Sequence, residues 1–212
     1  MLTTSIKNLS LFKIYDEINQ STYYGGDQEW YTKKWRRLAG CGPTAVSNIL
    51  YYLSRTQLDS GSNESPITKS GFISLMEEVW KYVTPKLGGI SSTKMLCDGI
   101  LGYAKSKART VKIDFIDVPK KKLTRPEFRQ LLTFLNEALR NDLPVAFLNL
   151  NQGTEKVLYS WHWVTITSLE YEDDGSVAFA NILDEGVVKK VDLAQWFLST
   201  SLGGGFVSFN WA

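Results

Sequence analysis

Histidine and cysteine are scarce in this sequence, which limits the chemistry it can carry. Its 212 residues include one histidine, His162, and two cysteines, Cys41 and Cys97. A closed zinc site commonly uses four Cys or His ligands. These three residues cannot complete one without several carboxylates. We therefore expect no metal and no cofactor.

Long hydrophobic runs and an excess of one charge are also missing. No apolar run is long enough to cross a bilayer, which predicts no membrane span. The net charge is only +2, so there is no electrostatic basis for nucleic acid as the main partner. The residues after Met1 are polar, with no basic segment leading into an apolar one. We expect a cytoplasmic protein, and secretion after processing and the oligomeric state stay open.

Helical periodicity marks four segments of the first 140 residues. The four residues Thr124–Glu127 match a capping box at the start of the last one. The first thirty residues show no regular pattern, and residues 60–66 form a polar loop. The predicted helices cover approximately residues 42–55, 69–84, 93–104 and 124–140.

Strand-like segments dominate the rest of the chain, joined by turns rich in Asp and Gly. The predicted strands cover residues 111–118, 144–150, 159–171, 176–183, 186–191 and 206–209, with a short helix over 193–198. Helices followed by an antiparallel sheet indicate an α+β fold. We expect a single domain over residues 1–212. A helical lobe of about residues 25–140 begins with the Cys41 helix, and a sheet lobe of about residues 141–212 carries His162.

Cys41 lies where a glycine-rich segment turns into a predicted helix. At that position, unpaired backbone N–H groups and the helix dipole stabilise a thiolate. Gly40 and Gly42 keep side chains away from an approaching substrate, and Pro43 suits the first helical turn. The alternative is a small buried cysteine in a glycine turn. Cys97 lies in the middle of a predicted helix, and we expect it to be inert.

His162 begins a predicted strand and is flanked by Trp161 and Trp163. An imidazolium next to Cys41 lowers the pKa of the thiol and holds a proton for a leaving group. The two tryptophans can shield such an ion pair and wall a substrate cleft. The alternatives are a histidine that is merely hydrogen-bonded on a strand face and tryptophans that fill the core.

Two residues on the following hairpin can orient the imidazole, and one upstream residue can stabilise an oxyanion. Asn181 ends an apolar run, whereas Asp184 falls in a turn, so we favour Asn181 and keep Asp184 as the alternative. Attack on a carbonyl develops negative charge. The backbone N–H of Cys41 and the side chain of Gln28 are the candidate donors, although Gln28 is equally compatible with an exposed loop.

The order of these residues resembles that of the papain-like cysteine peptidases. The segment Gly-Cys-Gly-Pro-Thr-Ala around Cys41, a distant His-Trp-Val and an Asn one hairpin later carry the resemblance. The pattern is closest to bacterial peptidases related to the bacteriocin-leader-processing domains of ABC exporters. The resemblance implies a two-lobe fold with a cleft between the lobes. In papain the oxyanion glutamine lies closer to the cysteine, and a tryptophan comes directly after the Asn-Ser.

The same resemblance implies hydrolysis of a peptide or isopeptide bond in a peptide or protein substrate. Cys41 is then the nucleophile that forms an acyl-enzyme, and His162 is the general acid and base. Two alternatives remain. The acyl group can pass to an amine, as in transglutaminase-like relatives, or the domain can be an inactive module that binds peptides. A complete Cys, His and Asn set argues against the inactive module.

Overall fold

The computed structural model describes residues 1–58 and 66–212. The loop expected over residues 60–66 falls, apart from Pro66, outside them. Within that part of the chain, the helices are α1 (Lys34–Ala39), α2 (Cys41–Leu53), α3 (Lys69–Val79), α4 (Thr93–Ser106), α5 (Phe128–Arg140) and α6 (Leu193–Ser199). The strands are β1 (Leu2–Ser5), β2 (Lys13–Asp16), β3 (Ser21–Tyr24), β4 (Ile67–Thr68), β5 (Val111–Val118), β6 (Val145–Asn149), β7 (His162–Tyr171), β8 (Ala178–Asp184), β9 (Val187–Asp192) and β10 (Gly204–Trp211).

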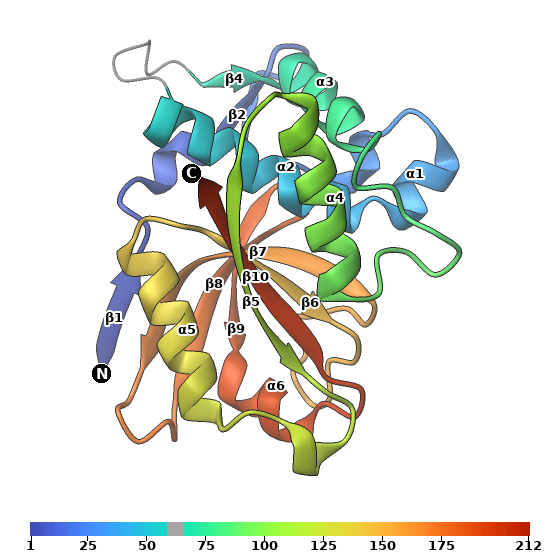
Figure 1. Cartoon of the computed structure of the whole chain (residues 1–212). Coiled ribbons are helices and arrows are strands. Elements are labelled where there is room, and N and C mark those ends of the chain that lie inside the picture. The colour runs from blue at the N-terminus through green and yellow to red at the C-terminus, as the bar shows by residue number, and fades with distance from the viewer. Residues whose placement is uncertain (59–65) are drawn as a thin grey trace.

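One large sheet forms the centre of the molecule (Figure 1). Its strand order is β5-β10-β6-β7-β8-β9, and β1 pairs with the far end of β7. The named strand pairs in this sheet are antiparallel. The expectation of an α+β fold with a large antiparallel sheet is therefore confirmed.

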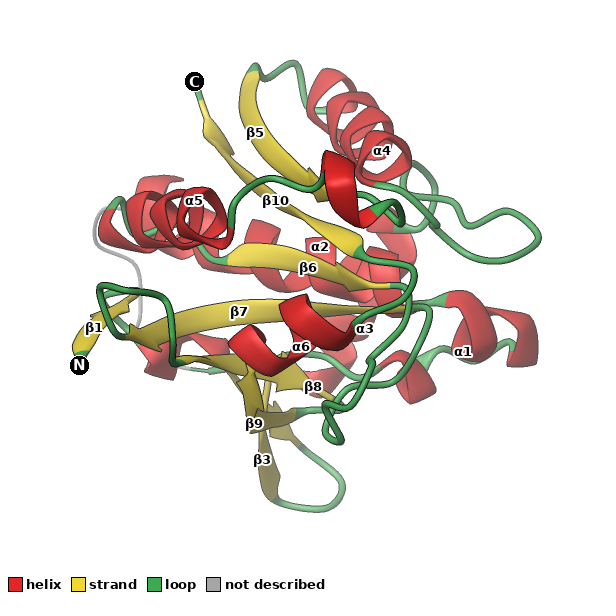
Figure 2. Ribbon diagram, turned by 90° about the horizontal axis from the view of Figure 1, so that it is seen from below, coloured by secondary structure: helices red, strands yellow, loops and turns green. Residues whose placement is uncertain are grey.

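Helices cover both faces of the large sheet, as alternating side chains of β6 show. Ala146 and Leu148 pack in one core with α2 and α4. Val145 and Phe147 pack in the other core with α5 and α6. Figure 2 shows α6 in front of β7 and α2 behind it. Because both faces are covered, every residue of β6 is buried.

Helix α2 is buried along its entire length. One side packs on the large sheet through residues such as Val46 and Ile49. On the other side, Tyr51 packs with α3 and with Ile14 of a small sheet of order β3-β2-β4. A helix enclosed in this way is held rigidly, and its first residue is Cys41.

The large sheet also includes strands from outside residues 141–212. We expected the sheet from residues 141–212, but β5 pairs with β10, and β1 pairs with β7 beyond the region that β6 occupies. The first thirty residues, expected to be irregular, form β1, β2 and β3. β1 is short and lies at the sheet margin with mostly exposed side chains, so it lacks the hydrophobic alternation that marks a half-buried strand.

Two helix boundaries differ from expectation. α3 ends at Val79 rather than near Thr84. α5 begins at Phe128 with Glu127 as its N-cap, and Gln130 completes the capping box. We expected Thr124 to be the cap, but Pro126 disfavours helical geometry in the preceding residue, and Arg125 is accordingly extended.

Candidate active site

Cys41 occupies the first position of α2, next to the start of β7. Gly40 ends α1 and also serves as the N-cap of α2, with no side chain capping the helix. The first backbone N–H groups of a helix have no partner within it, and the helix dipole favours negative charge there. The Cys41 side chain therefore lies at the positive end of the helix dipole, and it is 9% exposed.

The glycines beside Cys41 have a different role from the expected one. A Cβ on Gly40 would lie 2.4 Å from the backbone oxygen of Arg36 and 2.6 Å from the ring of Tyr31. A Cβ on Gly42 would lie 2.9 Å from Ile90. Both residues thus allow close packing of the protein against itself, which corrects the expectation that they clear space for substrate.

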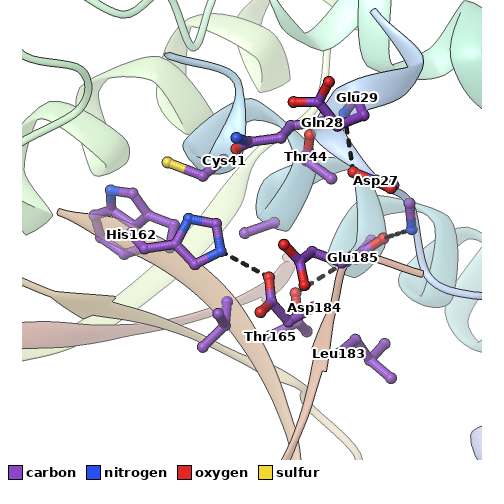
Figure 3. A pocket seen from close by; sticks show the side chains of 15 residues that line it. Asp27, Gln28, Glu29, Cys41, Thr44, His162, Thr165, Leu183, Asp184 and Glu185 are labelled. Atoms are coloured by element: carbon purple, nitrogen blue, oxygen red, sulfur yellow. Dashed lines mark hydrogen bonds and ion pairs between the residues drawn. The ribbon is translucent and has the colours of Figure 1, made fainter. Parts of the chain in front are cut away.

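His162 is the first residue of β7, and Asp184 is the last residue of β8. The His162 Nε2 atom lies 2.7 Å from Asp184 Oδ1. The Asp184 side chain is buried, and that of His162 is 13% exposed. Figure 3 shows the other ring nitrogen of His162 directed toward the Cys41 side of the cavity. The order along the site is therefore Cys41, His162 and Asp184.

Asn181 does not reach the imidazole. Its side-chain nitrogen donates to the Ser168 hydroxyl at 2.8 Å. Successive side chains of a strand alternate between its two faces, so Asn181 and Asp184, three positions apart, face opposite sides. The preference for Asn181 as the orienting residue is corrected, and the alternative, Asp184, holds this position.

Lys189 contacts the second oxygen of Asp184, a contact missed in the sequence analysis. Its Nζ lies 2.7 Å from Asp184 Oδ2 and 2.6 Å from a carboxylate oxygen of Glu185. The same Nζ lies 5.5 Å from the ring centroid of Tyr159, which packs edge-on to His162. The β8–β9 turn has only two residues. This length sets the pairing of the two strands so that Lys189 lies on the same face of the sheet as Asp184.

These contacts set the charges of the site. Burial lowers the pKa of His162, but hydrogen bonds to Asp184 and Cys41 raise it to about 10. Burial raises the pKa of Asp184, and its contacts with His162 and Lys189 lower it below its usual value overall. The arrangement therefore favours an imidazolium paired with the Asp184 carboxylate.

Gln28 lies in the same cavity as Cys41 and His162. It begins a short 3₁₀ turn, Gln28–Trp30, and Figure 3 shows its amide directed toward Cys41. The segment before it is anchored by Asn48 of α2, which accepts from the Gly26 N–H at 2.8 Å and donates to the Thr165 hydroxyl at 3.2 Å. The structure thus brings Gln28 to the cysteine, as expected.

The two tryptophans beside His162 and the second cysteine differ in exposure and in their contacts. Trp161 is 56% exposed beside the histidine. Trp163 lines the cavity of Cys41 and His162. It is buried, and its indole N–H donates to the Ile90 carbonyl at 2.6 Å. Its assignment as a substrate contact stays a prediction. Cys97 is buried in the middle of α4, and burial raises its pKa to about 11.

The described residues, 1–58 and 66–212, contain neither a metal-binding cluster nor a membrane-spanning helix. No group of three or more His, Cys, Asp or Glu side chains there is arranged to hold a metal ion. No helix in this part of the chain has the length and hydropathy to cross a bilayer.

Comparison with known proteins identifies the fold. No protein-family model matches the chain, and no curated protein matches its sequence. The chain is similar to the crystal structure of UfSP from C. elegans, with a TM-score of 0.56 and 11% identity. The match covers 100% of this chain and 34% of UfSP, so the chain spans about a third of that protein. UfSP is a cysteine protease of papain-like fold, and the similarity shows a papain-like fold for this chain.

Proposed function

We propose that the chain is a cysteine peptidase or amidase that cleaves a peptide or isopeptide bond of a peptide or protein. The observation that carries this proposal is the 2.7 Å contact between His162 and Asp184 in the cavity that Cys41 lines. A thiol at a helix start, a buried imidazole and an orienting carboxylate are the groups that nucleophilic catalysis by cysteine requires. The structural similarity to a cysteine protease supports the same conclusion.

The reaction proceeds in two steps. The Cys41 sulfur forms a bond to the carbonyl carbon, the C–N bond breaks, and the amine leaves with the proton that His162 held. Water then adds to the acyl-enzyme, its proton passes to His162, and the C–S bond breaks to release the acid. The negative charge on the carbonyl oxygen is stabilised by the Cys41 backbone N–H and the Gln28 amide.

Each supporting side chain has a defined task in this scheme. Asp184 orients the imidazole and stabilises its positive charge. Lys189 holds the second oxygen of Asp184 and keeps that carboxyl ionised. Trp161, exposed beside His162, is available to contact a substrate side chain. The closer relation to bacteriocin-leader-processing peptidases and the cytoplasmic location stay predictions.

The proposal is tested on the whole chain with an unbiased peptide library and with iodoacetamide. We expect cleavage of some library members, loss of cleavage in Cys41→Ala, and alkylation of Cys41 at pH 7 well above the rate of a simple thiol. Cys97, read by mass spectrometry in the same sample, is the matched control and should react slowly. Alkylation of Cys41 no faster than a simple thiol, together with cleavage that survives in Cys41→Ala, contradicts the proposal.

A further inference from the structure

Carboxylates crowd one wall of the cavity around Cys41. Asp27, Glu29, Asp184 and Glu185 all line it. Asp184 is bound by both His162 and Lys189, each at 2.7 Å. Glu185 is bound by Lys189 at 2.6 Å, and Glu29 lies 3.7 Å from Arg37. Among the residues that the structure describes, no cation lies within ion-pairing distance of Asp27. The negative charge of this wall is therefore only partly balanced by the protein itself.

Asp27 is the carboxylate of this group that has no cationic partner among the described residues. One of its oxygens accepts the Glu29 backbone N–H at 2.9 Å and caps the 3₁₀ turn, which fixes the side chain against the cavity. Burial raises the pKa of Asp27, and the charges of Glu29, Glu185 and Asp184 raise it further. A cation bound beside Asp27 would offset the repulsion from these neighbouring carboxylates.

A second observation places unfilled hydrogen-bond acceptors beside this carboxylate. Thr44 is 7% exposed, and its hydroxyl oxygen has no partner in the described part of the chain. The Tyr31 hydroxyl, which interacts with Thr44, donates its proton to the Met76 carbonyl at 3.3 Å and so leaves the acceptor positions of the Thr44 oxygen unfilled. The side-chain oxygen of Gln28 is likewise buried without a partner. Buried acceptors without donors are costly in a folded protein, so these two atoms point to a donor supplied by a ligand.

Thr44, Gln28 and Asp27 all line the cavity shared by Cys41 and His162. Figure 3 shows the Thr44 side chain between those of Gln28 and Asp27. The cavity has a volume of about 50 Å³, which suits the few atoms at the end of one side chain. A protonated nitrogen placed there can donate to the two neutral oxygens and pair with the carboxylate.

We propose that Asp27, Thr44 and Gln28 form a subsite for a cationic nitrogen group of the substrate, a lysine or arginine side chain next to the bond that is cleaved. This inference rests on the proposed function, because it assigns a substrate class to the same site. Asp27 supplies the charge, and the two neutral oxygens accept the N–H donors. The enzyme then selects basic sequences over neutral or acidic ones by charge.

The first experiment measures the charge effect at Cys41 and needs no substrate. Cys41 is modified by methanethiosulfonates that carry either a trimethylammonium or a sulfonate group, and mass spectrometry gives both rates. We expect Asp27→Asn to lower the ratio of cationic to anionic rates about threefold or more, with the rate of neutral iodoacetamide unchanged. A ratio that does not change overturns the proposal.

Two features make this comparison specific. Asn at position 27 keeps the side-chain oxygen that caps the turn, so the fold is retained. Asp98→Asn removes the same charge from an exposed carboxylate of α4 and should leave the ratio unchanged. If iodoacetamide shows no enhanced reactivity at Cys41, the proposed function fails, while the charge ratio still reports on the subsite.

The second experiment uses pairs of library peptides that differ only by lysine or norleucine next to the cleaved bond. We expect wild-type protein to cleave the lysine peptide about tenfold faster or more, and Asp27→Asn to lose most of that preference. Cleavage of the norleucine peptide should change little in the variant. Equal cleavage of both peptides by wild-type protein, or a preference that Asp27→Asn retains, contradicts the subsite.

Discussion

The two cysteines of this chain are equally buried and have opposite surroundings. Cys41 and Cys97 are each 9% exposed. Cys41 begins α2 and shares a cavity with His162, whereas Cys97 lies within α4, where burial raises its pKa to about 11. Exposure therefore does not distinguish the thiol that we propose as the nucleophile from Cys97. The neighbouring charge and the position in the helix do.

The largest expected effect removes the imidazole. We expect His162→Ala to lower peptide cleavage by about a thousandfold or more, because both proton transfers depend on this ring. Alkylation of Cys41 near neutral pH should fall toward the rate of Cys97, since the paired cation is gone. The check is mass spectrometry of both cysteines in one sample, and a Cys41 rate that stays at the wild-type level would show that His162 does not activate the thiol.

The next effect concerns the residue that orients the ring. We expect Asp184→Asn to lower cleavage by about tenfold to a hundredfold, because an amide holds the imidazolium less strongly than a carboxylate does. Asn181→Ala, three residues earlier on the same strand, is the matched control. It should leave the rate near that of wild type. Equal losses in the two variants would show that Asp184 has no special role.

A smaller effect, with a specific pH signature, comes from Lys189. Its contact helps to lower the pKa of Asp184, so Asp184 stays ionised as the pH falls until that lowered pKa is reached. In Lys189→Met the pKa of Asp184 rises, and activity should be lost at a higher pH on the acidic side. We expect about a threefold to tenfold loss on the acidic side of the profile and little change near neutral pH, where Asp184 stays ionised in both proteins, measured as a full pH profile.

A matched replacement separates charge from packing at this position. Lys189→Arg keeps the positive charge and should retain most of the wild-type cleavage activity on the acidic side of the pH profile. A profile for Lys189→Met that falls uniformly at every pH would instead indicate a purely structural contribution.

The smallest expected effect is at the second thiol. Cys97→Ala removes a buried sulfur from the α4 core and should lower the free energy of unfolding by about 1 kcal/mol. Cleavage and alkylation of Cys41 should be unchanged. Urea unfolding followed by circular dichroism measures the first quantity. A large loss of cleavage in this variant would place Cys97 in the chemistry and remove the contrast between the two thiols.

The sequence correctly predicted the elements whose periodicity and residue types point to the same structure. The glycines and proline around Cys41 marked a helix start, and the helix begins at that cysteine. The alternation in residues 111–118 marked β5 with its correct limits. Such features depend on neighbouring residues, so the sequence alone reports them.

The sequence did not predict contacts that depend on the register between strands. Asn181 and Asp184 lie on one strand, and only their parity relative to His162 decides which of them meets the ring. The contact of Lys189 with Asp184 also depends on register, because the two-residue turn between β8 and β9 decides which residues share a face. β1 was missed for another reason, since its polar residues owe their strand conformation to the backbone of β7.

The position of β10 has a consequence for how this protein folds. β10 follows every other described strand in the sequence, yet it lies inside the sheet between β5 and β6. Until β10 inserts, β5 has no partner in the sheet, and the faces under α2 and α4 lack Val207 and Phe209. Such long-range pairing makes folding slow. We therefore expect the core that holds the start of α2, with Cys41, to close late in folding.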